Sequence, residues 1–94
     1  MGALSQVEKI SQKYSVSAEE FIRSGAITNL KEKKRLLQIE RFEILSRYRA
    51  SSVEELNQKV AEGDAPEHPG WEDLIEVKNI EMEINEIEND IRIL

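Results

Sequence analysis

Residues 77–94 read VKNIEMEINEIENDIRIL, and this stretch decides the fold. Its apolar side chains recur at alternating intervals of three and four residues, at Val77, Ile80, Ile84, Ile87, Ile91 and Leu94. This spacing places them on one side of a helix, in the heptad seam by which coiled-coil helices pack together. The pattern therefore predicts a long C-terminal helix over residues 71–94, with an apolar seam that packs against another helix.

The charges beside this seam are all negative. One flank carries Glu76, Glu83 and Asp90, and the other carries Glu81 and Glu88. Two copies of this helix paired with each other would oppose like charges, at a cost of roughly a few tenths of a kcal/mol per pair. We therefore expect the seam to lie in a groove that is edged by lysine or arginine.

The segment 29–49 offers such a groove, because Lys34 and Arg41 project close to its apolar residues. Those apolar residues cover more than one side of the helix, which is typical of a central helix with several neighbours. We expect Lys34 or Arg41 to form a charge pair, within one chain or between two copies, with at least one of Glu76, Glu81 and Glu83.

The rest of the chain also has helical signals. No segment alternates apolar and polar residues as a strand does. Capping serines, glycines and prolines divide the chain into helices at about residues 4–14, 18–24, 29–49, 53–62 and 71–94. The second helix is expected to stop at Gly25, and the prolines and glycine of residues 64–70 predict the one clear loop. The predicted fold is an all-α bundle of about five helices, two of them long.

Two stretches resemble each other, residues 10–25 and residues 44–63. Each has a helix end with a tyrosine, a serine followed three residues later by a glutamate, and a closing glycine. The later copy has one more residue in its turn and a longer second helix. The serine–glutamate pairs are capping boxes, which satisfy free N–H groups at the start of a helix, at Ser17–Glu20 and Ser52–Glu55. We interpret the stretches as two helix–turn–helix units, which arose either by duplication or by two separate uses of a common capping pattern.

These elements predict one domain over residues 1–94. The two units in residues 1–63 surround the basic helix, the loop of residues 64–70 follows, and the acidic helix ends the chain. A chain this short buries a modest core. We expect this core to draw on Val7, Ile10, Phe21, Leu37, Ile44, Leu45, Leu56, Val60, Leu74 and Ile84.

The net charge of −6 is distributed unevenly along the 94 residues. Residues 1–50 carry ten Lys/Arg and six Asp/Glu, a balance of +4, whereas residues 51–94 carry three and thirteen, a balance of −10. An acidic half repels phosphate backbones and favours encounter with basic surfaces, although it can also serve solubility alone. The absence of cysteine and of any apolar run near ~18 residues predicts a cytoplasmic protein that does not enter a membrane.

The sequence shows no catalytic, cofactor or metal site. His68, the only histidine, stands between two prolines of the expected loop, and no serine–histidine–aspartate arrangement can be assembled around it. Zinc and calcium motifs and glycine-rich phosphate loops are also missing. We therefore expect a protein that is not an enzyme and needs no cofactor.

These observations favour a protein–protein interaction or assembly subunit. Its size and charge layout are similar to those of antitoxins, small proteins whose acidic C-terminal segment occupies the cleft of a basic toxin. The partner is expected to be a basic protein or a second copy, through helix 29–49 against helix 71–94. The expected partner-binding residues lie along the acidic helix, at Val77, Ile80, Glu81, Glu83, Ile84, Ile87, Glu88 and Ile91.

The alternative is a nucleic-acid-binding helix–turn–helix regulator that uses the basic helix 29–49. The two capping boxes argue against it, because glutamates stand at the helix starts where a recognition helix needs arginine, lysine or amide side chains. Those glutamates would repel the phosphates.

Overall fold

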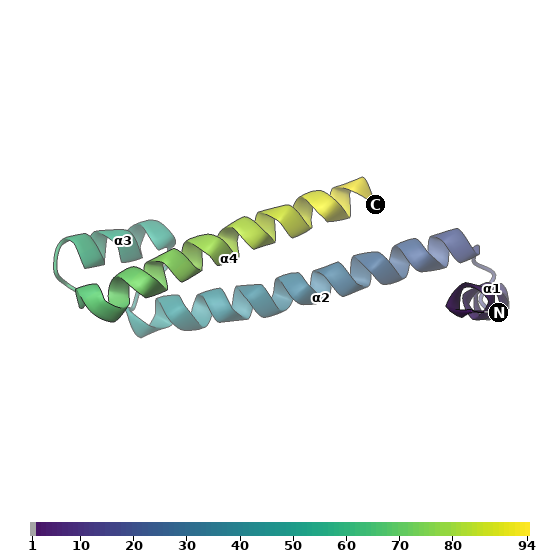
Figure 1. Ribbon diagram of the computed structural model, residues 1–94, viewed down its shortest axis with the longest axis horizontal. Coiled ribbons are helices and arrows are strands. Elements are labelled where there is room, and N and C mark those ends of the chain that lie inside the picture. The colour runs from purple at the N-terminus through teal and green to yellow at the C-terminus, as the bar shows by residue number, and fades with distance from the viewer. Residues whose placement is uncertain (1) are drawn as a thin grey trace.

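The computed structural model describes residues 2–94, which fold into four α-helices with no strand among them (Figure 1). The helices are α1 (Ala3–Lys13), α2 (Ala18–Arg47), α3 (Val53–Ala61) and α4 (Glu67–Ile93). The prediction of an all-α fold with two long helices is confirmed, and the number of helices is four rather than five. No helix of the described residues is long and apolar enough to cross a membrane.

The molecule is an elongated hairpin. Helices α2 and α4 lie side by side and antiparallel, α3 packs beside the first part of α4, and α1 lies across the start of α2 at the opposite end (Figure 1). The extents are 60 × 20 × 19 Å, and the radius of gyration is 19.6 Å. A compact chain of this length would have a radius of gyration of roughly 12 Å. The chain therefore leaves much of its surface on two long helices exposed.

The hydrophobic core lies at one end, where α2, α3 and α4 meet. Its buried apolar residues are Ile44, Leu45, Val53, Leu56, Val60, Ala65, Leu74, Val77, Ile80 and Ile84. Six of the ten predicted core residues are among them, and Leu37 packs against the cluster while partly exposed. Three predicted core residues lie at the other end, where Val7 is half-buried and Ile10 and Phe21 are exposed. Figure 1 shows why: α4 stops before it reaches α1.

Gly25 does not end a helix, and this prediction was wrong. Helix α2 runs through it without a break for 30 residues. A glycine inside a helix costs only about 1 kcal/mol relative to alanine, which a long helix tolerates. The predicted second helix and the predicted central helix are therefore one helix, and the first helix–turn–helix unit does not exist as a separate body.

The two similar stretches do share one turn geometry. Helices α1 and α2 are each followed, two residues beyond their last residue, by a residue in the left-handed region, Ser15 (φ 57°) and Arg49 (φ 55°). The next N–H in each case, of Val16 and of Ala50, donates to a carbonyl five residues back, at 3.1 Å and 3.0 Å. This is the Schellman arrangement, which satisfies the last carbonyls of a helix.

The predicted serine caps are also present, with one change. The hydroxyl oxygens of Ser17 and Ser52 each accept a hydrogen bond from the N–H three residues later, at 3.1 Å. The carboxylate of Glu55 accepts from the N–H of Ser51 at 3.0 Å, one residue before the expected serine, and Glu20 pairs with Arg23 instead. The caps therefore start α2 and α3 where the sequence predicts, without the full reciprocal box.

The predicted loop of residues 64–70 is shorter than expected. Helix α4 begins at Glu67, has one non-helical residue at His68, and is regular beyond it. Gly70 lies buried where α4 crosses α3, and a Cβ atom there would be 3.0 Å from Cγ2 of Val60. The missing side chain therefore allows the close approach of α4 to α3.

A pair of glycine substitutions tests the continuity of α2. Gly25→Ala is expected to stabilise the protein by about 0.5–1 kcal/mol, because Gly25 is helical and open space surrounds the position of the new Cβ atom. Gly63→Ala is the contrast and should destabilise by about 1 kcal/mol, because Gly63 has φ 81°. Urea unfolding followed by circular dichroism measures both. A loss of stability in Gly25→Ala would show that a helix ends there.

Candidate interaction surface

Two ion pairs connect α2 to α4. Nε of Arg41 lies 2.7 Å from Oε2 of Glu81, and Nζ of Lys34 lies 3.7 Å from Oε1 of Glu88. The two cations are seven residues apart on α2 and the two glutamates are seven residues apart on α4, so one register of the helices satisfies both pairs. The predicted charge pair is therefore present, within one chain, between Arg41 and Glu81. Lys34 pairs with Glu88, which lies seven residues beyond Glu81 and was not among the predicted partners.

A third polar contact lies at the end of α2. The Tyr48 hydroxyl donates a hydrogen bond to the Asp73 carboxylate, which is buried, and Nη1 of Arg47 lies 3.6 Å from Oδ1 of Asp73. Burial, together with the hydrogen bond to Asp73, raises the pKa of Tyr48 to about 12. The phenol therefore keeps its proton at neutral pH and remains a donor, which gives it a structural role.

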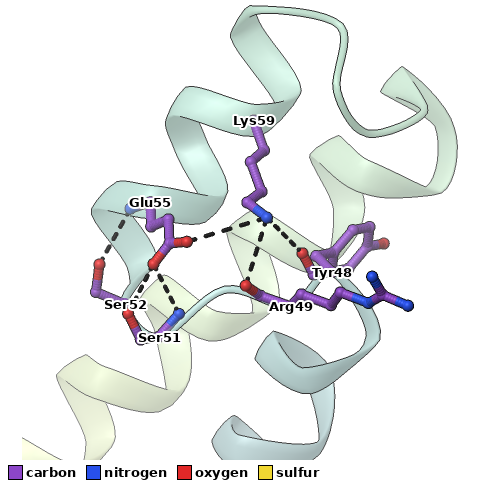
Figure 2. Close-up of polar contacts among 6 residues, drawn as sticks. All are labelled: Tyr48, Arg49, Ser51, Ser52, Glu55 and Lys59. Atoms are coloured by element: carbon purple, nitrogen blue, oxygen red, sulfur yellow. Dashed lines mark hydrogen bonds and ion pairs between the residues drawn. The ribbon is translucent and has the colours of Figure 1, made fainter.

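The turn after α2 is fixed by side chains of α3 (Figure 2). Nζ of Lys59 donates to the carbonyl oxygens of Tyr48 and Arg49, at 3.0 Å and 3.4 Å. The Glu55 carboxylate accepts from both the N–H and the hydroxyl of Ser51. An open depression of about 550 Å³ lies beside this turn, but Tyr48, Lys59 and Asp73 in its lining are all engaged in these contacts.

The heptad seam of α4 faces α2 and α3. Val77, Ile80 and Ile84 are buried in the core, and Ile87 and Ile91 are half-buried. Of the eight residues predicted to bind a partner, these five and the paired Glu81 and Glu88 thus have neighbours within the chain. A partner could reach the seam only if the hairpin opened. Glu83 is the exception, since it lies on the exposed side of α4.

The exposed side of α4 is strongly acidic. Glu76, Glu83 and Asp90 follow one another at intervals of seven residues, and Glu86 lies nearby on the same side. All four are exposed, and within residues 2–94 no ion pair involves any of them. We name these four residues the acidic face.

Two carboxylates of α2 extend the acidic face, Glu40 and Glu43. A hydrogen bond with the Glu76 carboxyl raises the pKa of Glu40, and burial and repulsion from Glu76, Glu83 and Glu43 add to this effect. Carboxylates are therefore crowded together at this edge of the hairpin. No group of residues in the described part of the chain is arranged to hold a metal ion.

Large apolar side chains are exposed on both long helices. On α4, Ile75 and Met82 are 57% and 62% exposed beside the acidic face. On the outer side of α2, Leu36, Ile39 and Phe42 form a stripe, with Phe42 70% exposed. The sequence suggested that α2 is central because apolar residues surround it, but only one side of its middle part is covered. The spacing in the sequence could have indicated a separate exposed stripe, because these residues recur every three residues and not at the alternating intervals of three and four found in the seam of α4.

His68 lies outside any site. Its side chain is 86% exposed, and Nδ1 lies 2.8 Å from Oε1 of Glu72 one helical turn later. This contact joins the histidine to the start of α4 and involves no third residue.

The comparisons with known proteins give a family and no function. A family model described as "Uncharacterized protein MJ0235 family" matches residues 1–94. No curated protein and no solved structure matches the chain.

Charge reversal tests the pair that joins the two long helices. Arg41→Glu is expected to lower the free energy of unfolding by about 1–2 kcal/mol, because it opposes Glu81 across a partly buried contact. Adding Glu81→Lys should restore part of the loss. Arg35→Glu is the control, since Arg35 pairs only with Glu32 on the same exposed surface. Equal losses for Arg41→Glu and Arg35→Glu in urea titrations would contradict the role of the interhelical pair.

The raised pKa of Glu40 predicts a pH dependence of stability. A carboxyl whose pKa is higher in the folded state contributes stability below its unfolded pKa and loses it as the pH rises through its folded pKa. Glu40→Gln should therefore raise the melting temperature at pH 7, and this gain should shrink as the pH falls through the raised pKa of Glu40 and vanish below the ordinary value of 4.5. Glu86→Gln, which removes an exposed carboxylate on the same face, is the control. A gain for Glu40→Gln that did not change with pH would argue against the contact with Glu76.

Proposed function

The chain belongs to the uncharacterized protein MJ0235 family, and for it we propose a non-enzymatic role as a cytoplasmic protein–protein interaction or assembly subunit. The surface we assign to this role is the acidic face of α4 with the exposed Ile75 and Met82 beside it. The partner we propose is a basic protein. The observation that carries the proposal is a row of exposed carboxylates without cationic partners next to exposed apolar side chains.

The composition of this surface supports a protein partner. Interfaces combine an apolar centre with a charged rim, and complementary charge speeds encounter and selects the partner. Ile75 and Met82 can supply apolar contact, and Glu83 and Asp90 can supply the rim. A lysine or arginine from a partner would also relieve the repulsion that raises the pKa of Glu40.

An antitoxin-like neutraliser is the most concrete form of this proposal. The acidic face would fill a basic cleft of the toxin while α2 holds α4 in its helical form. The Arg41–Glu81 and Lys34–Glu88 pairs support this arrangement, because they fix α4 from the opposite side. The helix would then lose little conformational entropy on binding, because it is already ordered.

The alternative role, a nucleic-acid-binding regulator that uses residues 29–49, has less support. Most cations of this segment contact carboxylates: Lys34, Arg35, Arg41 and Arg47 each lie within 4 Å of a glutamate or aspartate. Phosphate binding would have to compete with these pairs.

Affinity capture from the source cell tests the proposal when it is combined with surface variants. The tagged wild-type chain should capture a basic protein, and the purified partner should bind with an affinity that falls as salt rises. Glu83→Lys/Asp90→Lys should weaken this binding at least about tenfold, because it reverses two charges of the acidic face.

Glu54→Lys/Glu62→Lys is the matched control, since it makes the same change in net charge on α3 and at its C-cap. This control should bind the partner within about twofold of wild type, a difference of roughly 0.4 kcal/mol. The proposal fails if no basic protein is captured by the wild-type chain. It also fails if the two double variants weaken binding equally, because net charge rather than the acidic face would then explain the affinity.

A further inference from the structure

Within residues 2–94, the end of the molecule formed by α1 and the start of α2 has no third helix. The Arg41–Glu81 pair sets the register of the hairpin, and it places Leu94 level with Thr28. Residues 18–27 of α2 therefore extend beyond α4 by about 15 Å. Large apolar side chains are exposed on this end, which we name the open end: Leu4, Ile10, Tyr14, Phe21 and Ile22.

The internal similarity shows what this end lacks. Ile10 and Phe21 occupy the positions that Ile44 and Leu56 occupy in the later stretch. Ile44 and Leu56 are 2% and 0% exposed because α4 covers them, whereas Ile10 and Phe21 are 42% and 37% exposed. The same turn geometry thus produces a closed core at one end and an uncovered apolar surface at the other.

A hollow marks the uncovered position. It has a volume of about 410 Å³ and is lined by Val16, Glu20, Phe21, Ser24 and Gly25. Counted from the capping serines, Gly25 occupies the position of Val60 in the later stretch, and Val60 packs directly against Gly70 of α4. The small residues Ser24 and Gly25 leave space for the side chains of an incoming helix.

Charge indicates which occupant fits. Residues 2–28 contain three Lys/Arg and three Asp/Glu, so the open end is neutral and the whole net charge of −6 lies in residues 29–94. Arg23 also pairs with Glu19 and Glu20 on the same helix. Two open ends can therefore meet without the repulsion that two copies of α4 would experience.

We propose that two copies of this chain associate through their open ends, as a two-fold symmetric dimer in which Ile10, Phe21 and Ile22 of each copy are covered by the other. A two-fold axis brings one surface against itself, which suits a neutral apolar patch. A stable interface covers about 800 Å² per partner, which is roughly 12% of the 6913 Å² surface of one chain. The dimer leaves the acidic face exposed and does not depend on the proposed basic partner.

Light scattering and small-angle X-ray scattering of the purified chain test the dimer. The mass should be twice that of one chain, and the maximum dimension should approach twice the 60 Å length of the monomer, because the copies meet end to end. Ile22→Glu should reduce the mass to that of one chain while circular dichroism still shows the helices, since Ile22 is already 48% exposed. Phe42→Glu, on the outer stripe of the same helix, is the matched control and should remain dimeric.

Spin or dye labels locate the contact directly. Because the chain has no cysteine, Gln6→Cys places a single label at the open end and Glu62→Cys places one at the opposite end. Labels at residue 6 should lie close together in the dimer, and labels at residue 62 should lie far apart.

Three results would overturn the inference. The chain could be monomeric at every concentration, the dimer could dissociate in Phe42→Glu and persist in Ile22→Glu, or the maximum dimension could stay near that of one chain. The second result would assign the contact to the outer stripe of α2, and the third would indicate copies lying side by side. Glu83→Lys/Asp90→Lys should remain dimeric, so loss of a basic partner and loss of the dimer can be told apart.

Discussion

The register between α2 and α4 determines the rest of the structure. Arg41–Glu81 and Lys34–Glu88 repeat at intervals of seven on both helices, and Tyr48, seven residues after Arg41, contacts the buried Asp73, eight residues before Glu81. Sliding α4 by one heptad would place Glu88 level with Ile27, or Glu81 level with Tyr48, so a carboxylate would meet an uncharged side chain. It would also separate Asp73 from Tyr48, and a buried carboxylate without its donor is costly. Polar contacts thus select one register from several that the apolar seam alone would allow.

This register also divides the carboxylates of α4 into two groups. Glu81 and Glu88 lie on the side that meets the cations of α2, so their charge is compensated within the chain. Glu76, Glu83 and Asp90 lie on the other flank of the seam, where α2 presents Glu40 and Glu43, and no lysine or arginine of residues 2–94 forms an ion pair with them. The same heptad pattern therefore produces both the contact that stabilises the hairpin and the acidic face that remains available to a partner.

The sequence predicted the interactions that depend on spacing along one helix or on a short turn. The seam of α4 and the caps at Ser17 and Ser52 are of this kind, whereas the pair of Arg41 with Glu81 was predicted from the opposite charges beside the apolar residues of the two helices. The predicted helix end at Gly25 is absent because glycine stops a helix only where the backbone turns left-handed, and the residue type alone does not determine φ. The exposure of Ile10 and Phe21 could not be foreseen either, since it depends on how far α4 reaches along α2. That reach follows from the register and from the length of the α3 connection, which are tertiary properties.

The separation of the two surfaces has a consequence for binding. The open end is neutral and lies beyond the end of α4, whereas the acidic face runs along α4 toward the core. In a dimer joined by its open ends, the two hydrophobic cores would lie at the far ends of an elongated particle, and each half would expose one acidic face. A partner with two basic sites at matching distance would then bind the second site at a high effective concentration, and a partner with one site would gain nothing. The length of the hairpin would then determine the distance between the two acidic faces, and this distance would select the partners that can bind both faces at once.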